Sequence, residues 1–110
     1  IAIMRDGRMV QLGRPADLLL RPADDYVTSF VRDVSRLQVL RLEDVMTSAT
    51  KAPDNFKKAV SIDGKTTLEK CLIDLAPGQN HILVTGFQGK IIGHFSRDHL
   101  LKIANNEGTL

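Results

Sequence analysis

The chain has 110 residues, of which 43% are hydrophobic and 25% are charged, with a net charge of +2. This size predicts one compact domain with an appendage, and so small a net charge gives no reason to expect nucleic-acid binding. No run of about 18 apolar residues and no leader pattern is present, so we expect a soluble, cytoplasmic chain. The single cysteine, Cys71, excludes an internal disulfide, fits a reducing compartment and argues against structural zinc.

The two kinds of basic residue divide the chain. Every basic residue up to Glu43 is an arginine, whereas from Asp44 onward the basic residues are lysines, except for Arg97. A shift in composition of this kind indicates a boundary between two units. We therefore expect the chain to divide into residues 1–44 and residues 45–110.

The first unit is predicted to start with a β-hairpin. Residues 1–4 and 8–12 are short apolar strand candidates. Asp6 and Gly7, which lie between them, tolerate the positive φ of a tight hairpin turn.

Prolines mark the start of two predicted helices in the rest of the first unit. Pro15 favours the first turn of a short helix ending at Leu20, and Pro22 favours the first turn of a longer one. The longer helix is expected to reach Leu42 as a tether, because it has an apolar stripe at helical spacing. The stripe comprises Tyr26, Val27, Phe30, Val31, Val34 and Leu37, and Asp24 and Asp25 lie in the expected first turn.

Residues 1–31 resemble the end of the nucleotide-binding subunit of ABC importers for quaternary amines such as glycine betaine and proline. The positions that match the hairpin and helix motifs of that family are Met4, Gly7, Val10, Gln11, Gly13, Pro15, Leu19, Pro22, Asp25, Tyr26, Val27 and Phe30. The resemblance implies a parent subunit that binds ATP and Mg²⁺ and contacts a transmembrane permease at the inner face of the cell membrane. The alternative interpretation of these residues is a hairpin followed by an amphipathic helix.

No catalytic residues are predicted in the chain. Phosphoryl transfer needs a glycine-rich loop with its lysine, an acid for magnesium and a group that positions water. Residues 86–90 contain glycine and lysine, but they have neither the required spacing nor the following hydroxyl. We therefore expect no ATP hydrolysis by this chain.

The second unit is predicted to follow the order strand, helix, strand, strand, helix. Strands are expected over residues 59–62, 81–85 and 90–95, with a hairpin turn over residues 86–89. Two helices are expected, each beginning at a hydroxyl residue that can cap it. The first has Thr66 or Thr67 as its cap and Leu68, Cys71, Leu72 and Leu75 as its apolar stripe, and the second has Ser96 as its cap and contains Leu100, Leu101, Ile103 and Ala104.

With Val45-Met46-Thr47 ahead of it, this order resembles one CBS repeat, the cystathionine-β-synthase type of regulatory motif. The positions that match or nearly match are Val45, Met46, Thr47, Val60, Thr67, Leu68, Cys71, Val84, Gly89, Lys90, Ile91, Gly93, Ser96, Leu100 and Leu101. The resemblance implies an α+β fold, with a small mixed β-sheet and two helices on one face. Because such repeats work in pairs, it also implies a homodimer.

The CBS resemblance further implies an adenosine-type cleft, where the hydroxyl and the acid of a (T/S)-x-x-D motif contact ribose and phosphate. Ser96 supplies the hydroxyl, but His99 stands at the position of the acid and Asp98 lies one position early. A carboxylate accepts two ribose hydroxyls, whereas a neutral imidazole offers one acceptor. The candidate ligand residues are Ser61, Ile62, Ser96, Asp98 and His99, and Asp98 fits equally well as a first-turn residue of the last helix.

Three lysines, Lys51, Lys57 and Lys58, lie in a predicted loop, where a solvated surface is the default interpretation. In betaine importers, the CBS region resembles an ionic-strength sensor that acts through cationic patches at an anionic membrane. Attraction of about 1 kcal/mol per basic residue, weakened by salt, would suffice for a switch if several lysines act together. The histidines show no metal-ligand spacing, so no metal site is predicted.

Two functions remain open from the sequence. The second unit could be a sensor that changes the separation of two ATPase subunits in response to a nucleotide or to ionic strength, and so modulates transport. Alternatively, it could be a static dimerisation module that holds two ATPase subunits together without a ligand.

Overall fold

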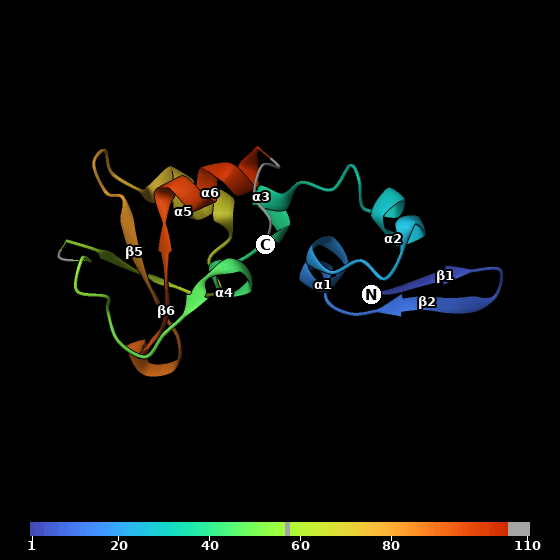
Figure 1. The fold of residues 1–110 in the computed structure, drawn as a ribbon, viewed down its shortest axis with the longest axis horizontal. Helices are drawn as coiled ribbons and strands as arrows, with labels where there is room; N and C mark the ends of the chain where they lie inside the picture. The colour runs from blue at the N-terminus through green and yellow to red at the C-terminus, as the bar shows by residue number, and fades with distance from the viewer. Residues whose placement is uncertain (57, 106–110) are drawn as a thin grey trace.

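The computed structural model describes residues 1–56 and 58–105, and it has an elongated shape with extents of 52 × 28 × 20 Å. Two packed units lie toward its two ends (Figure 1). We call the smaller unit, residues 1–30, the hairpin lobe and the larger unit, residues 36–105, the sheet lobe. The segment of residues 31–35 connects them.

The hairpin lobe begins with the predicted pair of strands. β1 (Ala2–Arg5) and β2 (Arg8–Leu12) are antiparallel, and the turn has a positive φ at Asp6 (51°) and at Gly7 (76°). Positive φ at both central residues is the requirement of a type I′ turn, so the predicted hairpin is confirmed. One face of the hairpin is buried through Ile3, which packs with residues of the two following helices.

Two short helices complete the hairpin lobe. α1 (Pro15–Leu20) begins at the proline, as predicted. α2 (Asp25–Phe30) begins at Asp25 rather than at Pro22. The reason is that the Asp24 side chain accepts a hydrogen bond from the backbone N–H of Val27 at 3.0 Å and thereby caps the helix.

The prediction of one long tether helix up to Leu42 is wrong. Helical structure stops after Phe30, and two helices of four residues follow, α3 (Arg36–Val39) and α4 (Leu42–Val45). Ser35 caps α3 by accepting a hydrogen bond from the N–H of Gln38, and such a cap starts a new helix. The predicted stripe is likewise only partly buried, because Val27 is fully buried whereas Phe30 and Val34 are exposed.

The break between α3 and α4 is stabilised by contacts distant in sequence. Leu40 is extended, and its carbonyl accepts a hydrogen bond from the N–H of Leu68 at 2.9 Å. The N–H of Leu42 donates to the carbonyl of Thr66 at 3.0 Å. Both leucine side chains are fully buried in the core of the sheet lobe, so a continuous helix would lose this burial.

The sheet lobe contains a four-stranded mixed sheet in the order β3-β6-β5-β4, in which β4 is parallel to β5 and the other neighbours are antiparallel. The predicted order of elements is confirmed, and β3 is a strand that the sequence did not predict. The elements are β3 (Thr47–Ser48), β4 (Val60–Asp63), α5 (Leu68–Asp74), β5 (His81–Thr85), the 3-10 helix η1 (Phe87–Gly89), β6 (Ile91–Ser96) and α6 (Arg97–Ala104).

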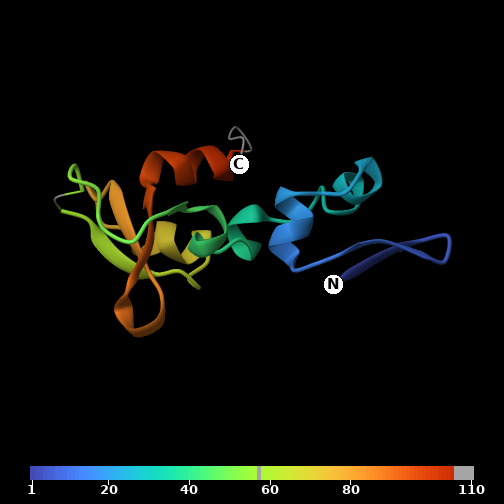
Figure 2. The same ribbon diagram turned by 60° about the horizontal axis from the view of Figure 1, so that its bottom comes forward.

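α5 and α6 lie on the same side of the strands (Figure 2). Their predicted caps are confirmed, because Thr67 accepts a hydrogen bond from the N–H of Lys70 and Ser96 accepts one from the N–H of His99, each at 3.2 Å. The α+β fold with a small mixed sheet is therefore confirmed. The core between helices and sheet includes Ile82, Val84 and Phe95 from the strands and Leu68, Cys71, Leu100 and Ile103 from the helices.

The larger core also receives residues from the first half of the chain. Leu40 and Leu42 belong to it, as do Ala16 and Leu19 of α1. The division of the chain after residue 44 stays a prediction.

Candidate functional site

The sheet has a second face, opposite α5 and α6, which we call the outer face. Because side chains alternate along a strand, the residues next to the buried Ile82, Val84 and Phe95 point to it. The register places Ser61 opposite Leu83 and Leu83 opposite His94 across three neighbouring strands. These side chains are exposed or half-buried, so the outer face is the part of the sheet open to a ligand.

An aromatic cluster occupies one end of the outer face. The ring of Phe56 stacks on the ring of His81, with centroids 4.2 Å apart and planes 3° apart. It also contacts His94 edge-on, with centroids 5.1 Å apart. Phe56 comes from the loop between β3 and β4, so this loop crosses the outer face. The parallel stack has the geometry by which aromatic side chains hold planar heterocycles.

No local pattern in the sequence predicts this cluster. The alternation of β5 and β6 could have placed His81 and His94 on one face, because both alternate with buried residues. Phe56 could not have been placed, since its loop has no periodic pattern that fixes which face it covers.

Of the predicted ligand residues, Ser61 and Ser96 share the outer face. Ser96 is paired with His81 at the end of β6, next to the aromatic cluster. Its hydroxyl accepts the capping hydrogen bond from α6, and its own O–H stays able to donate. Ile62 points the other way and packs against the core.

Asp98 and His99 diverge at the start of α6. Asp98 is exposed in the first turn of the helix. The ring of His99 instead packs against the buried Phe95, with centroids 4.8 Å apart. Burial and, to a smaller extent, the nearby charge of Lys102 lower the pKa of His99 below its usual value. His99 is therefore a poor cation and a poor substitute for a ligand-binding carboxylate.

The structure places two of the predicted lysines, Lys51 and Lys58, near opposite edges of the sheet. Lys51 follows β3, which is one edge strand of the sheet, and Lys58 precedes β4, which is the opposite edge strand. Both are exposed, and Lys57 lies outside the described residues.

The outer face carries polar groups that can bind a ligand. They include the hydroxyls of Ser61 and Ser96, the imidazoles of His81 and His94 and the ring of Phe56. Cys71 lies on the other side of the sheet, where burial raises the pKa of its thiol to about 11 and removes it as a nucleophile. Within residues 1–56 and 58–105, no three histidine, cysteine or acidic side chains group as a metal site, and no helix has the length and apolarity needed to cross a membrane.

Curated relatives cover most of the chain. It is 35% identical over 94 residues to the ATP-binding protein TmoW of a trimethylamine N-oxide transport system from Pelagibacter ubique. The matched region is 84% of this chain and 26% of that protein. It is 33% identical over 100 residues to the glycine betaine/proline betaine transport ATP-binding protein ProV of Escherichia coli, covering 91% of this chain and 24% of that protein.

A third relative is similar over a shorter stretch. The glycine betaine/carnitine transport ATP-binding protein GbuA of Listeria monocytogenes is 48% identical over 46 residues, which is 42% of this chain and 12% of that protein. No family model and no solved structure matches the chain. These three relatives are ATP-binding proteins of glycine betaine or trimethylamine N-oxide transport systems. The chain spans about a quarter of the length of the two that match most of it.

Proposed function

We propose that the chain is the C-terminal part of the ATP-binding subunit of an ABC importer for glycine betaine, proline or a related amine, and that its sheet lobe regulates transport. The main support is that two such relatives match 84% and 91% of the chain, so the similarity includes both lobes. The parent subunit would bind ATP and Mg²⁺ and contact a transmembrane permease from the cytoplasm. The chain itself hydrolyses no ATP, which a phosphate-release assay checks against the buffer rate.

In the favoured mechanism, the sheet lobe is a CBS-like sensor that binds an adenine nucleotide on its outer face. The stack of Phe56 on His81 supports this, because a purine could take the position of the Phe56 ring over the same imidazole. The hydroxyls of Ser61 and Ser96 are the available contacts for ribose. Two copies of the lobe would form a homodimer, whose geometry responds to the ligand.

Calorimetric titration of the 110-residue chain with AMP, ADP and ATP tests this mechanism. We expect saturable binding that raises the melting temperature, since a ligand of the folded state stabilises it. Ser61→Ala should weaken binding, whereas Ser29→Ala, in an exposed turn of α2, should not. If neither the unmodified chain nor Phe56→Ala binds any of the three nucleotides, nucleotide sensing is wrong.

Ionic-strength sensing is a second version of the same role. It needs Lys51, Lys57 and Lys58 to act together on an anionic membrane, and the separation of Lys51 from Lys58 on opposite sheet edges means that the membrane would contact a broad surface. Co-sedimentation with phosphatidylglycerol vesicles over a range of salt concentrations tests it. Binding that is absent at low salt would remove this version.

A ligand-free dimerisation module is the alternative function. Two observations favour it: Phe56 already covers one end of the outer face, and the Ser96 hydroxyl already caps α6. Sedimentation analysis with and without nucleotide separates the candidates. A dimer of constant affinity identifies the module, and a nucleotide-dependent dimer identifies the sensor.

A further inference from the structure

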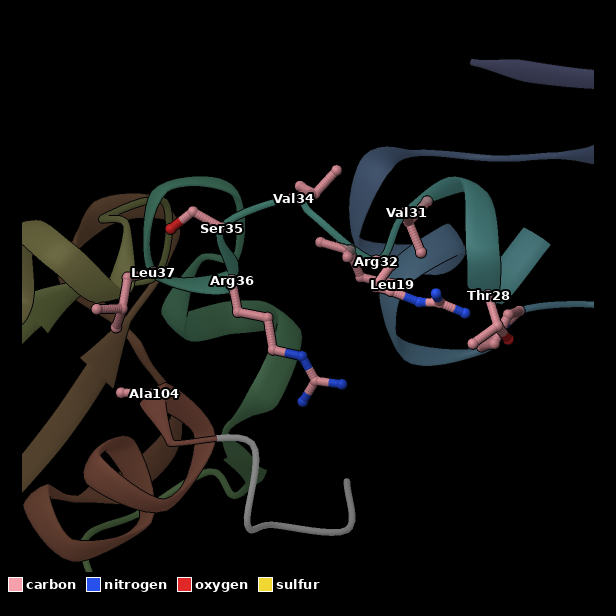
Figure 3. Close-up of a pocket in the computed structure, with 10 residues that line it drawn as sticks. Leu19, Thr28, Val31, Arg32, Val34, Ser35, Arg36, Leu37 and Ala104 are labelled. Carbon is pink, nitrogen blue, oxygen red and sulfur yellow. The ribbon is translucent and has the colours of Figure 1, made fainter. Parts of the chain in front are cut away.

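A groove lies between the two lobes, away from the outer face. Its volume is about 340 Å³, within the size range of small-molecule sites. It is lined by residues of α1, α2, the connecting segment, α3 and α6, with apolar side chains contributed from both lobes. Leu19 and Val31 lie on the hairpin side, and Leu37 and Ala104 lie on the sheet side (Figure 3).

Two arginines give this apolar groove a positive charge. Arg32 and Arg36 both line it, and Figure 3 shows Arg36 reaching from α3 into the space between the lobes. Within the part of the chain that the structure describes, neither guanidinium forms an ion pair. The one side-chain hydrogen bond of Arg32 there is long, at 3.4 Å to the hydroxyl of Ser29. Both guanidinium groups are therefore available to an external anion.

From this combination we propose that the groove binds a small anionic ligand with an apolar body, namely a carboxylate that carries a short alkyl chain. The guanidinium fork matches the two oxygens of a carboxylate, and its hydrogen bonds to a charged partner are the strong ones. The alkyl chain covers the leucine and valine walls, which would otherwise stay in water. A ligand whose only charge is a quaternary ammonium group is excluded, since that charge has the same sign as both arginines.

Occupation of the groove would fix the relation between the lobes. The ligand contacts side chains of both lobes at once, and the connecting segment of residues 31–35 contributes to the wall. Binding therefore favours the arrangement of lobes in which these side chains face one another. This site is separate from the outer face, and it stands independently of the proposed function.

The test is a titration of the ¹⁵N-labelled 110-residue chain with octanoate, followed by the amide shifts of Val34 and Ser35. We expect saturable shifts at these positions, and an affinity reduced at least about tenfold in Arg36→Gln, because a hydrogen bond to a charged group is lost. Arg32→Gln should also weaken binding. Arg8→Gln, on an exposed part of the hairpin, is the matched control and should bind as the unmodified chain does.

Three control ligands and one further variant make the outcome decisive. Acetate lacks the alkyl chain, and octanol and octylammonium lack the anion, so each should bind more weakly than octanoate. Equal affinity for acetate or for octylammonium would overturn the proposed ligand class. If Glu107→Gln binds octanoate and the unmodified chain does not, the proposal is also overturned. The groove would then be a site for the acidic tail of the chain itself. Unchanged binding by well-folded Arg36→Gln and Arg32→Gln refutes the role of the arginines.

Discussion

Replacing Leu40 by alanine tests how much the segment before residue 44 contributes to the core formed by the elements that follow it. The side chain is 0% exposed and lies in the same core as residues of α5, β5 and α6. Its backbone carbonyl accepts a hydrogen bond from the N–H of Leu68 at 2.9 Å. Alanine has the same backbone carbonyl, so we expect the variant to form this bond too. The substitution therefore removes packing alone.

The size of the effect follows from the burial. Truncation of a buried leucine to alanine costs about 2–5 kcal/mol, and complete burial at a junction of several elements places Leu40 in the middle of this range, at about 3 kcal/mol. For a chain of this size, such a loss lowers the melting temperature by roughly 10 °C or more. Leu101→Ala is the matched control, because Leu101 lies in α6 of the same lobe and is 41% exposed. It should change the stability by less than about 1 kcal/mol.

Urea unfolding followed by circular dichroism measures both variants, and an unchanged m-value shows that the same structure unfolds. A loss of less than about 1 kcal/mol for Leu40→Ala would refute the reasoning. Leu40 would then contribute little to this core, in agreement with the division of the chain after residue 44 that the sequence predicts.

Three further predictions address single positions. Gly93→Ala should destabilise the chain by about 2–3 kcal/mol in urea unfolding, because the added Cβ would lie 2.5 Å from the sulfur of Met46 and 2.6 Å from the carbonyl oxygen of Thr47. His99 has a lowered pKa in the folded chain, so its contribution to stability is present above its usual pKa near 6.5 and is lost as the pH falls through the folded value. Unfolding measured between pH 7.5 and pH 5 should therefore depend less on pH in His99→Gln, and an equal dependence would contradict this. The thiol of Cys71, whose pKa is raised from 9.0 to about 11, should react with a disulfide reagent at pH 8 about a hundredfold more slowly in the folded chain than in urea, and similar rates would show that the thiol is exposed.

The features that the sequence predicts correctly are those determined by local chemistry. Asp6-Gly7 determines a type I′ turn by itself, and Thr67 and Ser96 cap their helices through bonds to residues three positions on. The parallel pairing of β4 with β5 also agrees with the helix expected between them, since parallel neighbours need a crossover. These features depend on residues close together in the sequence.

The features that the sequence does not predict depend instead on contacts between residues far apart in the sequence. The apolar stripe continues past Phe30, but whether the chain stays helical there depends on the burial of Leu40 and Leu42 against elements that follow much later. β3 exists because Gly93 leaves room for the chain to approach β6, a contact that no local pattern encodes. The position of Phe56 over His81 is likewise a tertiary contact.

α1 links the two lobes, because its residues pack in both cores. Leu18 packs in the small core of the hairpin lobe, whereas Ala16 and Leu19, on the same helix, pack in the core of the sheet lobe. Arg14, just before this helix, forms an ion pair of 3.0 Å with Asp44, whose side chain is only 5% exposed and also accepts a hydrogen bond from the N–H of Arg41. A pair with one buried member is screened less by salt than an exposed pair. Because α1 is attached to both lobes, a movement of the sheet lobe must either carry α1 with it or break one of these contacts, and in both cases the hairpin lobe experiences the change.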